Sequence, residues 1–333
     1  MPPCVLCAVD DSPNAGDVIR VGARLKERLA LRLVIAHAVP APVTVGVATA
    51  PYAYPYPPDP EASREAGEAL VERIAGDVAE GTDVDLRALV GDPAESVLSL
   101  ADEEDAELIV VGSRRRGAVK AALLGSVSST LATRASCPVV VVPPERDRMT
   151  HMQTSKYIVT PMARARACGD NSEVPQSMIC GVDDSDAARE AVRVARDLSD
   201  RLGRRLILVH VFPADAPPGT SAVPHAGVEL HASERQGAEA LLWELAFEAG
   251  CGTDVERRAL AGQPPETLRE VAQAEGADLL VLGSRRRGGL AAALLGSVSR
   301  ELASTAPCPV VIVPAGVTDA RASASHEGES MKR

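Results

Sequence analysis

The amino-acid sequence predicts an α/β protein of two tandem doubly wound parallel-sheet domains, with five strands in each. Two observations predict this class. Short apolar runs typical of strands alternate with segments of helical periodicity, and the whole alternation occurs twice along the 333 residues. Strands that alternate with helices form a parallel sheet with right-handed crossovers and helices on both faces.

The chain is an internal duplication. The stretch 110–143 recurs at 281–314, and 23 of the 32 positions from Gly112 to Pro143 are identical. Upstream, CAVDDS at 7–12 recurs as CGVDDS at 180–185. We therefore expect one domain at 1–144 and another at 177–315, joined by a polar linker at 145–176. The segment 316–333 is rich in small and charged residues, which predicts a disordered tail.

The elements of the first repeat follow from its periodicity. The apolar run 5–9 predicts the first strand, and Ser12 as N-cap with Pro13 at the first helical position predicts a helix start. Strands are then expected at 33–38, 84–90, 108–111 and 139–142. The intervening helices are expected to end near Gly81 and to occupy 95–104 and 126–135. The second repeat follows the same order, with its third strand at 255–261.

Composition excludes several classes of protein. The chain has 35 Lys+Arg against 46 Asp+Glu, a net charge of −11, which argues against binding to nucleic-acid backbones. Its apolar runs are shorter than the roughly 20 residues that span a bilayer, and the N-terminus lacks the basic region of a signal peptide. We expect a soluble, cytoplasmic protein with neither a nucleic-acid nor a membrane partner.

Cysteine and histidine residues do not suggest a metal site. The seven cysteines are scattered through apolar runs, unlike a disulfide framework. Cys4 and Cys7 form a C-x-x-C pair within a predicted strand, where residues three apart point to opposite faces. The six histidines form no cluster with metal-ligand spacing. We therefore predict no metal site and treat the cysteines as buried small side chains.

The predicted architecture places a ligand site in each repeat. In open doubly wound sheets, ligands bind beyond the carboxyl ends of the strands where the winding reverses. The loops at that point follow the first and fourth strands, and they carry Asp10 and Gly112 in the first repeat and Asp183 and Gly283 in the second. Further along, Gly125-Ser126 and Gly296-Ser297 open helices whose free N–H groups attract anions.

This pattern resembles the universal stress protein (UspA) family, and the chain looks like a tandem two-domain member. ATP-binding members of that family carry G-x-x-G, nine residues, and then G-[ST] after the fourth strand. The resemblance implies a Rossmann-like fold with strand order 3-2-1-4-5 and ATP as ligand, with or without Mg²⁺.

The resemblance assigns nucleotide contacts to matching positions in both repeats. In the first repeat these are Ala8, Asp10, Ala38, Val111, Gly112, Arg115, Gly125, Ser126, Val127 and Ser128. In the second they are Gly181, Asp183, Val211, Leu282, Gly283, Arg286, Gly296, Ser297, Val298 and Ser299. The resemblance places the base against Ala38 and Val211. The hydroxyls of Ser128 and Ser299 either reach the γ-phosphate or only cap the helix.

One position departs from the family pattern. The second glycine of G-x-x-G falls on Arg115 and Arg286, because both copies read G-S-R-R-R-G. An arginine there costs about 1 kcal/mol or more if the backbone needs a positive φ. A guanidinium also binds phosphate through bidentate hydrogen bonds. The arginines therefore either obstruct the phosphate loop or serve as phosphate ligands.

Motifs of catalysis are absent from the sequence. It has no G-K-[ST] phosphate loop, G-x-S-x-G elbow or H-E-x-x-H pair, and we identify no general base for ATP hydrolysis. We expect a nucleotide-binding stress-response or signalling module that acts through conformation or partner binding. The alternative is a nucleotide-free interaction module of the same fold. An ATP-hydrolysing or adenylate-forming enzyme is a third hypothesis, which the missing base and nucleophile disfavour.

The last strand of each repeat predicts how the repeats associate. CPVVVVP and CPVVIVP are continuously apolar, yet the implied strand order leaves this strand at a sheet edge. An exposed apolar edge invites pairing. We expect the two repeats to pair edge to edge within one chain as a pseudo-twofold dimer, as family members do. The sequence leaves open a further homodimer and the identity of any protein partner.

Overall fold

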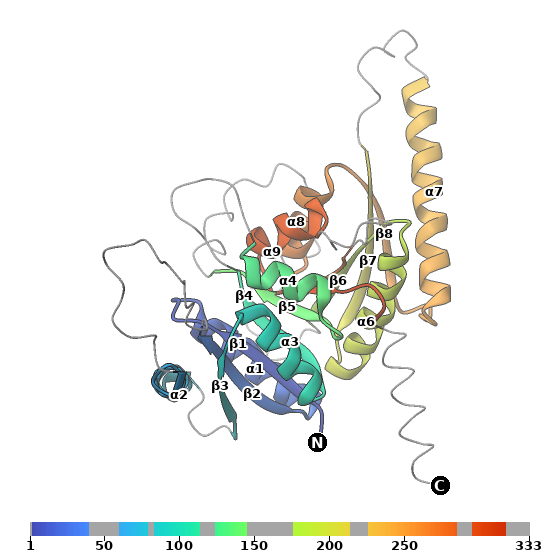
Figure 1. The fold of residues 1–333 in the computed structure, drawn as a ribbon. Coiled ribbons are helices and arrows are strands. Elements are labelled where there is room, and N and C mark those ends of the chain that lie inside the picture. The colour runs from blue at the N-terminus through green and yellow to red at the C-terminus, as the bar shows by residue number, and fades with distance from the viewer. Residues whose placement is uncertain are drawn as a thin grey trace, which may run out of the picture.

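A computed structural model of the chain describes residues 2–39, 60–78, 83–113, 124–144, 176–213, 226–284 and 295–317. The Tyr- and Pro-rich segment 50–60, the linker from 145 to 175, and the arginine loops with Arg115 and Arg286 lie outside the described residues, apart from the backbone of Pro60. Within the described ranges, strands and helices alternate through both repeats (Figure 1).

The first repeat contains five strands and four helices among its described residues. They are β1 (Cys4–Val9), α1 (Ala15–Leu29), β2 (Arg32–Val39), α2 (Pro60–Val78), β3 (Asp85–Val90), α3 (Pro93–Glu103), β4 (Ala106–Gly112), α4 (Ser126–Arg134) and β5 (Val139–Val142).

The second repeat has the same order of elements. They are β6 (Ser177–Val182), α6 (Asp186–Leu202), β7 (Arg205–Phe212), α7 (Ala226–Glu248), β8 (Glu256–Ala261), α8 (Pro264–Ala274), β9 (Leu279–Gly283), α9 (Ser297–Thr305) and β10 (Val310–Val313). The α/β fold class and the alternation predicted from sequence are confirmed.

All ten strands belong to one sheet, in the order β3-β2-β1-β4-β5-β10-β9-β6-β7-β8. Neighbours within each repeat are parallel, whereas β5 and β10 pair antiparallel, with Val141 opposite Val310 and Val139 opposite Ile312. The structure thus joins the two repeats through their last strands. All four residues of β5 and of β10 are buried.

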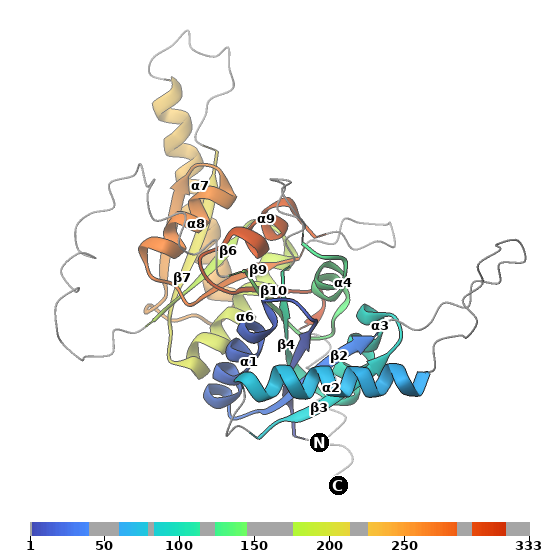
Figure 2. The same ribbon diagram turned by 90° about the vertical axis from the view of Figure 1, so that its left-hand side faces the viewer.

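Helices cover both faces of this sheet (Figures 1 and 2). Alternate residues of β1 illustrate the division: Cys7 belongs to the core beneath α1, α2, α6 and α7, and Cys4 to the core beneath α3, α4, α8 and α9. The two thiols of the C-x-x-C pair therefore point to opposite faces, as predicted. Burial raises the pKa of the Cys4 thiol to about 11, which makes this thiol a weak nucleophile at neutral pH.

The predicted start of the first helix is wrong. α1 begins at Ala15 with Asn14 as N-cap, and the carbonyl of Ser12 accepts a hydrogen bond from the Ala15 N–H at 3.0 Å. The Asn14 side chain is instead used in a tertiary contact, because its Nδ2 donates to the Val142 carbonyl at 3.0 Å. In the second repeat the matching Ser185 does cap α6, accepting from the Ala188 N–H.

A buried carboxylate ties α3 to the outer strands of the first repeat. Glu104 is 5% exposed and accepts hydrogen bonds from Arg32 at 3.1 Å and Arg87 at 3.0 Å. Burial acts to raise the pKa of Glu104, but hydrogen bonds and charge from both arginines outweigh it and lower the pKa below its usual value. Glu275 makes the matching cluster with Arg205 and Arg258 in the second repeat.

Two residues of the segment predicted as a tail pack against the second repeat. The Gly316 N–H donates to both carboxylate oxygens of Glu190 at 2.8 Å, and Val317 is 2% exposed. The packed chain therefore continues at least to Val317.

The β5–β10 junction predicts the effect of a charge placed inside it. Val141→Lys or Ile312→Lys should loosen the pair of repeats, because a lysine cannot keep its ammonium buried between these strands without a partner. Small-angle scattering should show a larger radius of gyration, while far-UV circular dichroism retains the native helix and strand content. An unchanged compact particle in both variants contradicts the assignment of β5 and β10 as the junction.

The Glu104 cluster predicts a loss of stability in acid. Because the folded pKa is lowered, this stabilisation exists above the pKa of unfolded glutamate and is lost as pH falls through the lower folded value. Glu104→Gln should lower the unfolding free energy at neutral pH by about 2 to 3 kcal/mol, since two arginines lose their carboxylate. Urea titrations at neutral and acidic pH measure this. The exposed neighbour variant Glu103→Gln serves as the control and should change little.

Candidate functional site

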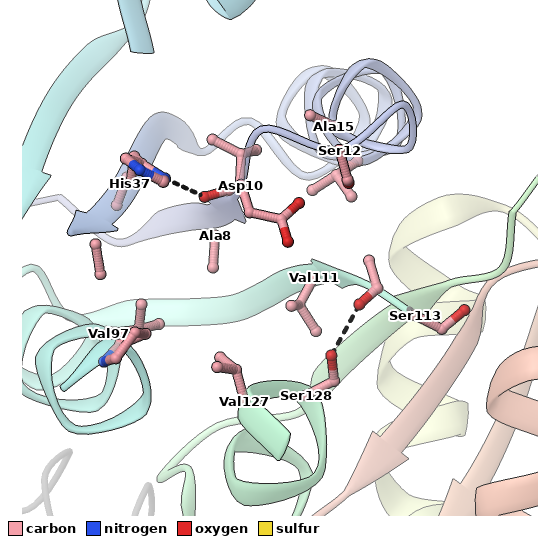
Figure 3. Close-up of a pocket in the computed structure, with 16 residues that line it drawn as sticks. Ala8, Asp10, Ser12, Ala15, His37, Val97, Val111, Ser113, Val127 and Ser128 are labelled. Atoms are coloured by element: carbon pink, nitrogen blue, oxygen red, sulfur yellow. Dashed lines mark hydrogen bonds between the residues drawn. The ribbon is translucent and has the colours of Figure 1, made fainter. Parts of the chain in front are cut away.

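A cavity of about 210 Å³ lies at the carboxyl ends of β1, β2 and β4 in the first repeat. Its apolar lining includes Ala8, Ala38, Val97, Val111 and Val127. Figure 3 shows the Asp10 carboxylate pointing into this space from the end of β1, while Val97 and Val127 approach from α3 and α4. Because the lining of this cavity combines apolar side chains with polar ones, the cavity suits a ligand that has an apolar part and a polar or charged part.

A second cavity of about 200 Å³ lies at the corresponding place in the second repeat, at the ends of β6, β7 and β9. Several of the predicted residues line each cavity. In the first these are Ala8, Asp10, Ala38, Val111, Gly112, Val127 and Ser128. In the second they are Gly181, Asp183, Val211, Leu282, Gly283, Gly296, Ser297, Val298 and Ser299. Gly125 and Ser126 stand at the start of α4 without lining the first cavity.

Some lining residues were not predicted from sequence. They are Val9, Ser12, Ala15, Val18, Ala36, His37, Pro93, Val97 and Ser113 in the first cavity, and Val182, Ser185, Ala188, Val209, Pro264 and Leu268 in the second. Pro93 and Pro264 each start a helix directly after the third strand of their repeat. A proline at the same place in both repeats is visible in the sequence, and it could have indicated that α3 and α8 line the cavities.

Gly283 is packed against the backbone at the start of α6, whereas the close neighbour of Gly112 is the Asn14 side chain. A Cβ on Gly283 would lie 2.4 Å from the backbone oxygen of Ala187 at the start of α6. A Cβ on Gly112 would lie 2.8 Å from Asn14 Nδ2. The sequence suggested that these glycines let the chain approach a phosphate. The structure supplies a packing reason that holds with or without a ligand.

Gly125 and Gly296 occupy a different environment. They are the N-caps of α4 and α9, with extended backbone (φ −60°) and no side-chain cap. A Cβ on Gly296 would meet nothing within 4 Å. The packing around Gly296 therefore does not require a glycine, and no side-chain cap is bonded to the first-turn N–H groups of α4 or α9. An uncapped helix start of this kind attracts anions.

Two serines brace the strand against the helix that follows it. The Ser128 hydroxyl donates to the Gly112 carbonyl at 2.8 Å, and the Ser299 hydroxyl donates to the Gly283 carbonyl at 3.2 Å. Both serines are buried. Because each hydroxyl has one proton and donates it to a carbonyl here, the oxygen is left as an acceptor, which does not suit a phosphate.

Histidine and aspartate side chains fix the ends of the first two strands. His37 Nδ1 lies 2.8 Å from the Val9 carbonyl, and His210 Nδ1 lies 2.9 Å from the Val182 carbonyl. Since a carbonyl only accepts, Nδ1 is the donor in both contacts. The Asp183 carboxylate accepts from the N–H and the hydroxyl of Ser185. His37 and His210 therefore connect the second strand of each repeat to the end of the first.

No cluster of three or more metal-ligating side chains occurs among the described residues. In that same part of the chain, no helix is long and apolar enough to cross a membrane.

The model of the universal stress protein family matches residues 3–143 and 176–314. The chain belongs to the universal stress protein family. Universal stress protein Rv2623 of Mycobacterium tuberculosis is 30% identical over 318 residues, covering 94% of this chain and 97% of that protein. A universal stress protein of Mycolicibacterium smegmatis is 30% identical, covering 93% and 96%.

Solved structures agree on the fold. A functionally unknown protein, PA1789 from Pseudomonas aeruginosa PAO1, aligns over 98% of both chains with a TM-score of 0.58 and 15% identity. A universal stress protein from Archaeoglobus fulgidus aligns over 93% of this chain and 98% of its own, with a TM-score of 0.55 and 17% identity. Both of these structures align with the two repeats of this chain.

The different surroundings of Gly283 and Gly296 predict losses of stability of different size for the same substitution. Gly283→Ala should destabilise the second repeat by about 2 kcal/mol or more, because the new methyl group would meet backbone that cannot move away cheaply. Gly296→Ala should cost less than about 1 kcal/mol, the usual penalty for losing a glycine N-cap. Thermal or urea unfolding measures both. Equal losses in the two variants would contradict the packing explanation.

Proposed function

We propose that the chain binds ATP in the cavity of each repeat and acts as a nucleotide-dependent stress-response module. The observation that carries the proposal is the uncapped start of α4 and α9 beside each cavity. A phosphate group would supply acceptor oxygens where no side-chain cap does, and the helix dipole would favour its negative charge.

The rest of each cavity supports the same ligand. The apolar walls formed by Ala8, Ala38 and Val111 suit an adenine ring, and Asp10 at the end of β1 stands where a ribose hydroxyl could donate to it. Arg115 and Arg286 would add cationic contacts to the phosphates, with or without Mg²⁺. In this proposal Ser128 and Ser299 support the phosphate loop by holding the carbonyls of Gly112 and Gly283.

We further propose that the protein is not an enzyme of appreciable turnover and that it works in the cytoplasm. The described cavity walls combine serine, aspartate and histidine residues that already hold backbone groups. ATP occupancy would then change conformation or the choice of a protein partner. A phosphate-release assay should give slow or no turnover.

Calorimetry with repeat-specific variants tests ATP binding. Ala38→Phe should remove the nucleotide from the first repeat and Val211→Phe from the second, because a phenyl ring would occupy the space given to the base. Each variant keeps the other cavity intact and so serves as the control for the other. The double variant should bind no ATP. Protein purified without added nucleotide should release ATP on denaturation.

Substitution of Arg115 and Arg286, together with ATP titration of the unmodified protein, distinguishes ATP binding from the alternative of a nucleotide-free interaction module. Arg115→Gly with Arg286→Gly should weaken ATP binding about ten-fold if the guanidinium groups are ligands, since each loses charge-assisted hydrogen bonds. Tighter binding in this variant would identify the arginines as obstructive. Absence of heat and of released nucleotide in the unmodified protein would overturn the proposed function.

A further inference from the structure

A cavity that bears several charged groups lies between the two repeats and shares no lining residue with the cavity of either repeat. It measures about 580 Å³ and is lined by the end of α1, the residues after α6 and the segments that precede β9 and β10. We refer to it as the seam cavity. Small-molecule sites occur preferentially at such domain interfaces and in this range of volumes.

The pseudo-twofold symmetry of the molecule is broken at one ion pair beside the seam cavity. On one side of the molecule, Arg201 at the end of α6 pairs with Glu107 at the start of β4 of the first repeat. Arg28 and Asp278 occupy the symmetry-related positions on the other side. Their pairing is replaced, because Arg204 Nε lies 2.6 Å from the Asp278 carboxylate.

A single difference between the repeats accounts for this replacement. The position just before the second strand is Arg204 in the second repeat and Leu31 in the first. Leu31 is 9% exposed and packs in the core, so Glu107 has no such competitor within its own repeat. Asp278 pairs with Arg204 of its own repeat. Arg28 therefore faces the seam cavity, as does Arg24 one helical turn before it.

The charged groups of the seam cavity have unused hydrogen-bonding capacity. Among the described residues, the guanidinium groups of Arg24 and Arg28 form neither a hydrogen bond nor an ion pair. Asp278 Oδ1 is buried without a hydrogen-bond partner. Three arginines face this cavity against two carboxylates, Glu27 and Asp278, in a protein whose net charge is −11.

We infer that the seam cavity is a binding site for a small hydroxylated organic anion. The anionic group, a carboxylate or a phosphate, is held by Arg24 and Arg28. A hydroxyl of the same ligand donates its proton to Asp278 Oδ1, which satisfies the buried acceptor. Burial raises the pKa of Asp278, and Arg204 and Arg28 act to lower it, so a ligand that supplies a hydrogen bond here also relieves a poorly solvated carboxylate.

Calorimetry on the full chain with saturating ATP tests this site, because ATP keeps the probes out of the nucleotide cavities. The probes are glycerol 3-phosphate and citrate, which carry the two kinds of anion beside a hydroxyl. At least one should bind. The matched probe without the hydroxyl, propyl phosphate or propane-1,2,3-tricarboxylate, should bind about ten-fold more weakly, since Asp278 Oδ1 loses its donor.

Variants locate the site. Arg24→Gln with Arg28→Gln should weaken probe binding about ten-fold or more, while ATP affinity and thermal stability stay unchanged. The control is Arg193→Gln, which removes an exposed charge from α6 outside the seam cavity and should leave probe binding unaltered. The inference is overturned if neither probe binds, or if the paired variant binds the probe as tightly as the unmodified protein. Neither result bears on the ATP sites.

Discussion

The antiparallel pairing of β5 with β10 is the contact on which the rest of the structure depends. Each strand is a short, continuously apolar run that a single repeat would leave as an exposed edge. Paired, they turn two five-stranded sheets into one sheet and bury both edges completely. The same contact fixes the cavities of the two repeats relative to one another, and α1 and α6 are in contact across the seam.

Much of this architecture is predictable from the sequence because it rests on local patterns. Apolar runs predict the strands, and the β5 range of 139–142 agrees with the structure residue for residue. The start of α1 was not predictable in this way. Ser12 and Pro13 form a strong local helix signal, but Asn14 makes a hydrogen bond to Val142, a residue far away in sequence. Tertiary contacts of this kind leave no mark on periodicity.

The candidate site shows the same division between local and tertiary information. The position of the cavity follows from the doubly wound topology, and the glycines could be found from sequence. Their roles could not. Gly283 is required because the backbone of α6 lies against it, whereas a side chain at Gly296 would meet no neighbouring atom. In the sequence both residues are simply glycines beside an apolar stretch. Only the distances distinguish a glycine that the fold needs from one that leaves room for a ligand.

Duplication followed by small changes gives the two halves of this chain different surfaces on one scaffold. α1 begins at the cavity of the first repeat, where Ala15 and Val18 line the wall, and ends at the seam with Leu25 and Arg28. The start of β9 also lines the seam cavity, and its other end lines the cavity of the second repeat at Gly283. A ligand in the seam would therefore contact one element from the cavity of each repeat. Because Arg204 replaces Leu31, the ion pairs differ on the two sides of the seam, and the cavity between them is lined by both repeats.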